Sequence, residues 1–145
     1  RIKDYLEEGE DFCLTYGDGL ANINIGDLIK FHKRHGKMVT LSAIYPPARF
    51  GSLELKDAQV TSFYEKPKGD GAFINGGFFV VNFKAIDYIK GDSTIWEQEP
   101  LNKLATDGEL MSHKHEDFWH PMDTLRDKNY LNDLWEKDIA PWKIW

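Results

Sequence analysis

The order of sequence patterns before residue 46 is the feature that most constrains the fold. The run at 11–16 (DFCLTY) is apolar and typical of a buried strand, and it ends at the turn signal Gly17-Asp18-Gly19. Asn24 has the position of a helix N-cap and Gly36 that of a helix stop, so the spacing predicts a helix between them. A second strand pattern follows at 38–45. This order of strand, turn, helix and strand predicts an α/β protein.

Strand and helix patterns continue to the end of the chain. Residues 51–56 and 59–65 predict a hairpin, and residues 72–83 predict a longer strand. Residues 1–8 have the pattern of the tail of a helix. The other predicted elements are helices at about 84–90 and 100–107, strands at 110–116 and 118–122, and a helix through Trp135 capped by Thr124 and Asp127. Strands joined both by hairpins and by helices indicate a mixed sheet. No linker or repeat interrupts the pattern, so we expect residues 1–145 to belong to one domain without an internal boundary.

Composition excludes several classes of protein. Eighteen Lys and Arg against 24 Asp and Glu give a net charge of −6, which argues against binding to nucleic acid. No apolar stretch approaches the ~20 residues of a membrane span, and no signal peptide opens the chain, so we expect a cytoplasmic protein. Cys13 is the single cysteine, which excludes an intrachain disulfide; it lies in an apolar run and is expected to be an inert thiol in the core.

Two aspartates are candidate metal ligands. Asp18 lies on a turn flanked by glycines at the carboxyl end of a predicted strand, where α/β sheets bind ligands. The alternative is a turn aspartate that hydrogen-bonds to its own backbone. Asp123 follows another predicted strand, and its alternative role is to stabilise the N-terminus of the next helix. If the two strand ends converge, the carboxylates form an oxygen-rich site suited to Mg²⁺, but spacing alone does not bring them together.

Two further strand regions carry residues suited to a sugar phosphate. Lys66 can pair with a phosphate as a point charge, and Glu65 can accept hydrogen bonds from sugar hydroxyls. The alternative is a solvated strand end stopped by Pro67. Gly76-Gly77 inside a predicted strand indicates either a bulge or the close approach of a ligand to the backbone. Asn75 beside them offers both a donor and an acceptor.

These segments together resemble the sugar-phosphate nucleotidylyltransferases. The matching segments are LTYGDG at 14–19, FHKRHGK at 31–37, PPARFG at 46–51 and EKPKGDGAFINGGFFV at 65–80. Three narrower motifs are similar to the members that act on glucose 1-phosphate with CTP: WEQEP at 96–100, FWHPMDTLRDK at 118–128 and PWKIW at 141–145. The resemblance extends over essentially the whole chain, in order, and implies a Rossmann-like nucleotidyltransferase fold.

The resemblance also implies a reaction and roles for individual residues. The reaction is the transfer of a cytidylyl group from CTP to α-D-glucose 1-phosphate, which gives CDP-glucose and pyrophosphate for the dideoxysugars of lipopolysaccharide O-antigen. Asp18 and Asp123 match the carboxylates that hold Mg²⁺, and Gly17 matches a backbone contact to the nucleotide. Lys66 matches the lysine that binds the sugar phosphate. The positions that match the lining of the sugar pocket are Gly51, Glu65, Asn75 and Gly76.

One expected element of the family is absent from this sequence. The glycine-rich GxGTR-type loop, which lies near the N-terminus of the whole enzyme and cradles the triphosphate, is not found. We therefore expect the chain to be the C-terminal part of the enzyme and to be inactive alone. The resemblance implies a homo-oligomer when the enzyme is full-length. Two alternatives stay open: a uridylyl- or thymidylyltransferase acting on the same sugar phosphate, and a non-catalytic subunit that binds a sugar nucleotide.

Overall fold

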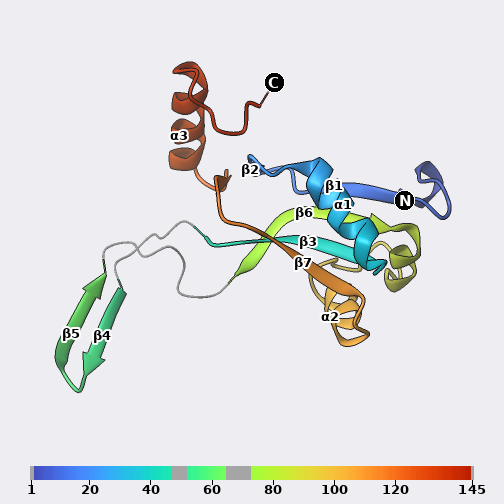
Figure 1. Ribbon diagram of the computed structural model, residues 1–145, viewed down its shortest axis with the longest axis horizontal. Coiled ribbons are helices and arrows are strands. Elements are labelled where there is room, and N and C mark those ends of the chain that lie inside the picture. The colour runs from blue at the N-terminus through green and yellow to red at the C-terminus, as the bar shows by residue number, and fades with distance from the viewer. Residues whose placement is uncertain (1, 47–51, 65–72, 145) are drawn as a thin grey trace.

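The structure is a computed structural model and describes residues 2–46, 52–64 and 73–144 (Figure 1). Its strands are β1 (Asp11–Thr15), β2 (Gly19–Ala21), β3 (Val39–Ile44), β4 (Ser52–Lys56), β5 (Gln59–Tyr64), β6 (Ile74–Asn82), β7 (Leu110–His115) and β8 (Trp119–Pro121). Its α-helices are α1 (Ile25–His35), α2 (Glu99–Thr106) and α3 (Leu125–Glu136), and its 3₁₀ helices are η1 (Lys3–Tyr5) and η2 (Phe83–Tyr88). No helix in the described part of the chain is long and apolar enough to cross a membrane.

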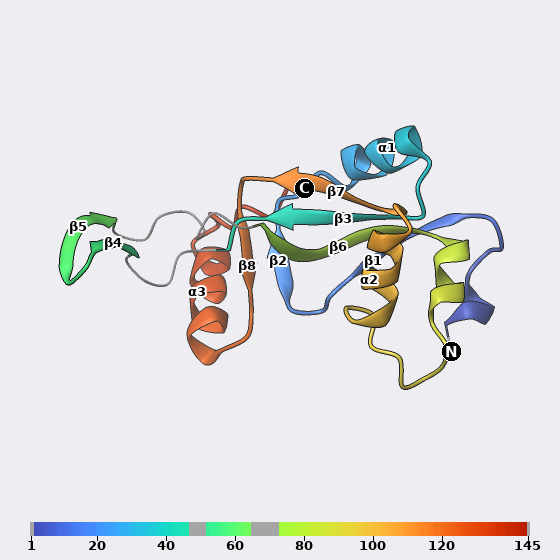
Figure 2. The same cartoon turned by 90° about the horizontal axis from the view of Figure 1, so that it is seen from below.

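Four strands form the central sheet in the order β1-β6-β3-β7. β6 pairs antiparallel with β1 and with β3, whereas β7 runs parallel to β3. In Figure 2, α1 covers one face of this sheet, while η2 and α2 lie on the other. The predicted α/β class with a mixed sheet is therefore confirmed.

Alternation along the strands gives the sheet an apolar layer on each face. The layer under η2 and α2 is the larger one, and its buried members are Val39, Phe79, Val81, Ala85, Leu101 and Leu104. The layer under α1 contains Ile23, Leu28 and Val80. Val80 and its neighbours in β6 thus point alternately into the two layers, as a strand covered on both faces requires.

The predicted helix caps are present. Asn24 Oδ1 accepts a hydrogen bond from Asp27 N–H (3.1 Å) at the start of α1, and Gly36 ends this helix with φ of +64°. Thr124 and Asp127 form a reciprocal capping box at α3: Thr124 Oγ1 accepts from Asp127 N–H (3.2 Å), and Asp127 Oδ2 accepts from Thr124 N–H (2.9 Å). Both helices therefore begin where these local signals place them.

The paired glycines of β6 form a bulge, as one of the two sequence hypotheses predicted. The register between β3 and β6 shifts from Leu41–Phe79 to Ala43–Asn75, which leaves extra residues in β6. A Cβ at Gly76 would lie 2.9 Å from Ile44 Cγ2. Gly77 has φ of +77°, and a Cβ there would lie 2.7 Å from Tyr16 Cδ2. Close packing against the protein itself therefore explains both glycines.

Two small sheets complete the structure. β4 and β5 pair antiparallel around a turn in which Asp57 has φ of +54°, so the predicted hairpin is confirmed. β2 and β8 form a two-stranded ribbon in which Gly19 pairs with Pro121 and Ala21 with Trp119. This ribbon joins two parts of the chain that the sequence patterns gave no reason to connect.

Two local predictions are wrong, and one predicted helix has an unexpected type. The helix predicted at about 84–90 is present as the 3₁₀ helix η2 at 83–88, because the segment before Gly91 is too short to gain much from α-helical hydrogen bonds. Only Lys3–Tyr5 of the helical pattern at 1–8 is helical, again as a 3₁₀ turn. Cys13 is exposed, because Phe12 and Leu14 take the core-facing positions of the edge strand β1 and leave Cys13 on the other face.

Candidate functional site

The two candidate metal ligands lie at the same end of the β2–β8 ribbon. One residue pair beyond Gly19–Pro121, Met122 N–H donates to the carbonyl oxygen of Asp18 (2.8 Å). Asp123 follows Met122 directly, so the ribbon brings these two distant aspartates to neighbouring strand ends, and both are exposed. The structure thus supplies the convergence that spacing alone could not.

The alternative role of Asp18 is not seen. Among the described residues, no hydrogen bond uses the Asp18 carboxylate, so it does not bond to the backbone of its own turn. At the start of α3, Thr124 and Asp127 close the capping box, and Asp123 takes no part in it. Two exposed carboxylates beside a turn of small residues are a donor set that fits Mg²⁺, which in proteins takes one or two carboxylates together with waters and substrate phosphates. The described part of the chain contains no cluster of three or more His, Cys, Asp or Glu that could hold a metal ion.

The β6 bulge lies next to the ribbon and is bonded to it. Trp119 of β8 donates its indole Nε1–H to the carbonyl oxygen of Gly76 (2.8 Å). Asn75 Oδ1 accepts from Gly77 N–H (2.9 Å), and Asn75 Nδ2 donates to the hydroxyl oxygen of Tyr16 (2.9 Å). Two predicted sugar-pocket positions, Asn75 and Gly76, are therefore held in one orientation beside the strands that carry the aspartates.

Two residues of this cluster were missed as site residues by the sequence analysis. Tyr16 is half-buried between the turn and the bulge, and Glu97 is one of the residues that affect the pKa of its hydroxyl. Burial is the largest cause that raises the pKa of Tyr16, and the Glu97 carboxylate adds to it, so the Tyr16 hydroxyl is neutral at physiological pH. Both residues lie inside motifs quoted for the resemblance, LTYGDG and WEQEP, and that membership was the signal that could have identified them.

Of the remaining predicted site residues, the structure describes only Gly17. Gly17 is an exposed turn residue between Tyr16 and Asp18, and a Cβ there would meet nothing within 4 Å. Gly51, Glu65 and Lys66 lie outside the described residues.

The ribbon is anchored to α3 through a buried carboxylate. His120 Nε2 of β8 lies 3.1 Å from Asp127 Oδ1, and the His120 ring packs against the Tyr130 ring at a centroid distance of 4.9 Å. The hydrogen bond from Thr124 is the largest cause that lowers the pKa of Asp127, so this group is ionised at neutral pH. The cap of α3 therefore also fixes the strand that leads to Asp123.

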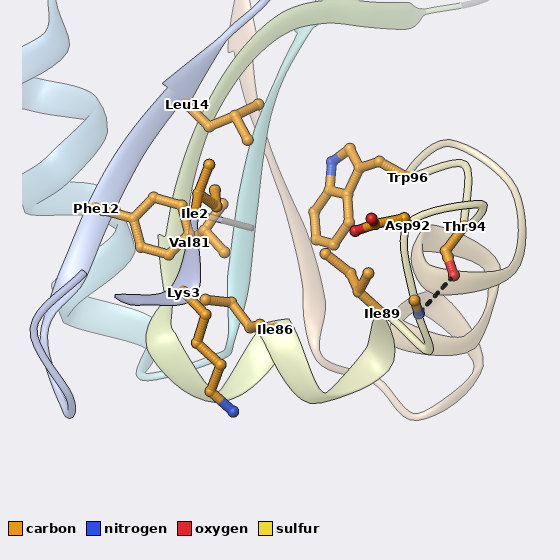
Figure 3. Close-up of a pocket in the computed structure, with 11 residues that line it drawn as sticks. Ile2, Lys3, Phe12, Leu14, Val81, Ile86, Ile89, Asp92, Thr94 and Trp96 are labelled. Carbon is orange, nitrogen blue, oxygen red and sulfur yellow. Dashed lines mark hydrogen bonds between the residues drawn. The ribbon is translucent and has the colours of Figure 1, made fainter. Parts of the chain in front are cut away.

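A cavity of about 350 Å³ opens elsewhere on the molecule, beside β1, β6 and η2 (Figure 3). Apolar side chains supply most of its lining, among them Phe12, Leu14, Ile86 and Ile89, and the Trp96 indole closes one side. None of the predicted site residues lines this cavity. The candidate site is therefore the polar surface where the ribbon meets the β6 bulge.

Comparison with known proteins identifies the family. The family profile described as Nucleotidyl transferase matches residues 1–135. The chain belongs to the nucleotidyl transferase family. Proteins named glucose-1-phosphate cytidylyltransferase, from Salmonella typhimurium and from Salmonella typhi, are each 59% identical to it over 145 residues, which is 100% of this chain and 56% of each relative. The family resemblance predicted from the motifs is thus confirmed.

The chain spans little more than half the length of these nucleotidyl transferase relatives. The prediction that it is their C-terminal part is not confirmed by the comparison, which establishes that the relatives are longer than the matched region. Among solved structures, HddC from Yersinia pseudotuberculosis is similar with a TM-score of 0.66 and 20% identity, over 92% of this chain and 59% of that chain. At this identity the likeness shows the fold alone, and it confirms the predicted nucleotidyltransferase fold.

Proposed function

We propose that the full-length protein is a glucose-1-phosphate cytidylyltransferase, which transfers a cytidylyl group from CTP to α-D-glucose 1-phosphate. The observation that carries this proposal is the 59% identity, over all 145 residues, to two Salmonella relatives of that name. The clustering of Asp18, Asp123 and Asn75 around one polar surface supports it, since a nucleotide and a sugar phosphate need metal-binding carboxylates and hydrogen-bonding groups side by side.

The reaction needs no covalent intermediate with the protein. An oxygen of the sugar phosphate attacks the α-phosphorus of CTP, a new P–O bond forms, and the bond from the α-phosphorus to the bridging oxygen breaks to release pyrophosphate. Catalysis then rests on positioning the two substrates and on neutralising the charge of their phosphates. The backbone of Gly17 would contact the nucleotide, and Lys66 would bind the phosphate of the sugar.

Asp18 and Asp123 would hold the Mg²⁺ ion. When bound, the ion stabilises negative charge that develops on the phosphate oxygens. The contribution of the chain is to fix both carboxylates on one ribbon, through the Asp18–Met122 backbone hydrogen bond and the anchoring of His120 to Asp127. The sugar would lie against Gly51, Glu65, Asn75 and Gly76.

Several properties of the whole protein belong to the same proposal. Residues 1–145 would form part of one nucleotidyltransferase domain, in a cytoplasmic enzyme that draws on the CTP pool. The product, CDP-glucose, would supply dideoxysugars for O-antigen. A homo-oligomer is supported by exposed apolar side chains at the C-terminal end, where Trp135 is 48%, Ile139 60% and Ile144 72% exposed.

Release of pyrophosphate by the full-length protein tests the proposed function. Glucose 1-phosphate and Mg²⁺ are supplied with CTP, UTP, dTTP, ATP or GTP in separate reactions. We expect release with CTP alone. Release with UTP or dTTP instead would favour the uridylyl- or thymidylyltransferase, and no release with any nucleotide from a folded protein would favour the non-catalytic subunit. The identity to relatives named for cytidylyl transfer gives neither alternative support.

A further inference from the structure

Two histidines in the last turn of α1 converge on one buried hydroxyl of β3. His32 Nδ1 lies 2.8 Å from Thr40 Oγ1, and His35 Nε2 lies 2.7 Å from the same oxygen. Thr40 is fully buried, His32 is 2% exposed, and His35 is half-buried. In Figure 2, α1 lies over the strand that carries this threonine. The three side chains therefore join the end of the helix to the central sheet, and we call them the Thr40 relay.

The protons of the Thr40 relay are ordered by the groups at its two ends. The backbone N–H of Lys37 donates to His35 Nδ1 (2.9 Å), so a neutral His35 ring carries its proton on Nε2. That proton is donated to Thr40 Oγ1, and the Thr40 hydroxyl donates its own proton to His32 Nδ1. The neutral His32 ring then has its proton on Nε2, which faces Asp11 Oδ1 of β1 at 3.5 Å. Each donor thus points at an acceptor while both rings are neutral.

A second proton on His35 is incompatible with this order. His35 Nδ1 would become a donor facing the Lys37 N–H, so the 2.9 Å hydrogen bond between them would be lost. The positive charge would also have to be accommodated in a half-buried position. Burial, followed by the nearby His32 and Lys37, accordingly lowers the pKa of His35. Protonation of His35 therefore competes with closure of the Thr40 relay.

Titratable and charged side chains surround His35 on every element packed against it. They are His32 and Arg34 on α1, Lys37 after this helix, Asp11 on β1, Glu109 before β7 and His113 on β7. Glu109 offsets only part of a charge on His35, because its carboxylate already accepts a hydrogen bond from Lys37 Nζ (3.2 Å). Asp11 lies beside His32 instead. A proton on His32 would thus face a carboxylate, whereas a proton on His35 would face a backbone N–H donor.

The hydrogen bond that this proton would break lies at the connection between α1 and β3. The helix ends at His35, Gly36 follows in left-handed conformation, and β3 begins at Val39. The bond from Lys37 N–H therefore closes the short connection, and the Thr40 relay fastens the helix on one side of it to the strand on the other. Opening the relay would free the end of the helix, while the pairing of β3 with β6 and β7 does not depend on these side chains.

We propose that the Thr40 relay is a pH-sensitive latch, which holds the end of α1 on β3 while His35 is neutral and releases it when His35 takes up a proton. The inference goes beyond the proposed function and involves no substrate, so its test does not depend on the reaction. It gives a role to the two histidines of FHKRHGK at 31–37, a motif that the candidate site leaves unused.

Hydrogen exchange followed by mass spectrometry tests the latch in the full-length protein. Exchange is measured at about pH 8 and about pH 5.5, on either side of the ordinary histidine pKa, with times scaled for the chemical exchange rate at each pH. We expect peptides that cover residues 25–40 to lose protection about three- to tenfold at the lower pH, as for the loss of one hydrogen bond, while peptides of β6 keep theirs. Equal protection of residues 25–40 at both pH values would overturn the proposal.

Replacement of single histidines assigns the effect to His35. His35→Asn removes the titrating ring and should make the protection of residues 25–40 nearly the same at both pH values. His113→Asn is the matched control, because the His113 ring packs on Phe31 at 5.2 Å, as the His35 ring does at 5.1 Å, but lies outside the Thr40 relay. This control should keep the wild-type dependence on pH. A His35→Asn protein that loses as much protection as the wild type would show that the proton acts elsewhere.

The hydroxyl and the tautomers of the Thr40 relay provide a second measurement. Thr40→Val removes the hydroxyl and should lower the protection of residues 25–40 at both pH values, whereas Thr40→Ser keeps it and should behave as the wild type does. Nitrogen-15 NMR of labelled histidines at about pH 8 should show both His32 and His35 as neutral rings protonated on Nε2. A proton on Nδ1 of His35 at that pH, or a Thr40→Ser protein without the pH dependence, would refute the latch.

Discussion

Replacing Gly77 with alanine tests whether the β6 bulge is built by contact between the bulge and Tyr16. A side chain at this position is disfavoured for two separate reasons, the backbone conformation and a close contact. The backbone has φ of +77°, and the new Cβ would lie 2.7 Å from Tyr16 Cδ2. At Gly36 only the backbone conformation disfavours a side chain, since φ is +64° and an added Cβ would meet nothing within 4 Å. At Gly76 only the close contact does, since an added Cβ would lie 2.9 Å from Ile44 Cγ2. These three glycines therefore form a matched series.

The expected free energies of unfolding follow from these two terms. Left-handed backbone costs an alanine roughly 1–2 kcal/mol, partly offset because alanine also restricts the unfolded chain, so Gly36→Ala should lose about 1 kcal/mol. Overpacking typically costs about 1–3 kcal/mol, which is the expectation for Gly76→Ala. Gly77→Ala combines both terms and should lose roughly 2–4 kcal/mol. At roughly 2–4 °C per kcal/mol, Gly77→Ala should lower Tm by about 5–15 °C.

Thermal unfolding followed by circular dichroism measures the three variants in the full-length protein, and pyrophosphate release measures their activity. Because Gly77→Ala must move the Tyr16 ring, we expect it also to lower kcat/KM for the sugar phosphate, whereas Gly36→Ala should not. If Gly77→Ala loses no more stability than Gly36→Ala, the Tyr16 contact contributes nothing and this explanation of the bulge is refuted. A Tm equal to that of the wild type would refute the backbone term as well.

Three further predictions concern the metal ligands, the α3 cap and the half-buried His35. Asp18→Asn and Asp123→Asn should each lower kcat at least about a hundred-fold, as for other groups that stabilise charge in the transition state, without lowering Tm; unchanged turnover would refute their role. Thr124→Ala should lower the free energy of unfolding by about 1 kcal/mol in urea titrations. The pKa of Asp127 is lower in the folded protein than in the unfolded chain, so its ionised carboxylate stabilises the fold above the unfolded-state pKa. This contribution disappears as pH falls through the folded-state pKa of Asp127. Thr124→Ala removes the main cause of the lowered pKa and should therefore make the free energy of unfolding fall less steeply below about pH 4. Burial lowers the pKa of His35, so the folded state binds a proton there less readily than the unfolded chain, and the free energy of unfolding falls as pH drops below about 6.5. His35→Asn should reduce this decrease between about pH 7 and 5. An unchanged dependence of the free energy of unfolding on pH would contradict this prediction.

Elements specified by neighbouring residues could be predicted from the sequence. Asn24 and Gly36 bound α1, and Thr124 with Asp127 begins α3, because a cap depends on side chains within one turn of the helix. The bulge at Gly76-Gly77 was also predictable, since paired glycines weaken a regular strand. What the glycines contact was not predictable: Ile44 and Tyr16 come from other strands or turns.

Features that depend on the edges and connections of the sheet were not predictable. An apolar run indicates a strand but not its place in the sheet, so Cys13 was expected in the core although β1 is an edge strand with Cys13 on its exposed face. Spacing gave no distance between Asp18 and Asp123, because their proximity depends on the pairing of β2 with β8. The packing of Trp96 against Phe79 likewise joins residues from separate parts of the chain, and no sequence pattern indicated it.

The short β2–β8 ribbon has a consequence for how the site responds to ligands. It has only three paired positions and lies outside the four-stranded sheet, to which Trp119 bonds it through the Gly76 carbonyl oxygen. Segments with few backbone hydrogen bonds open locally, so amide protons of β2 and β8 should exchange with solvent faster than those of β3 and β6. A ligand held by both the ribbon and the bulge would slow that exchange. Part of the free energy of substrate binding would then be offset by the cost of ordering the strands next to Asp18 and Asp123.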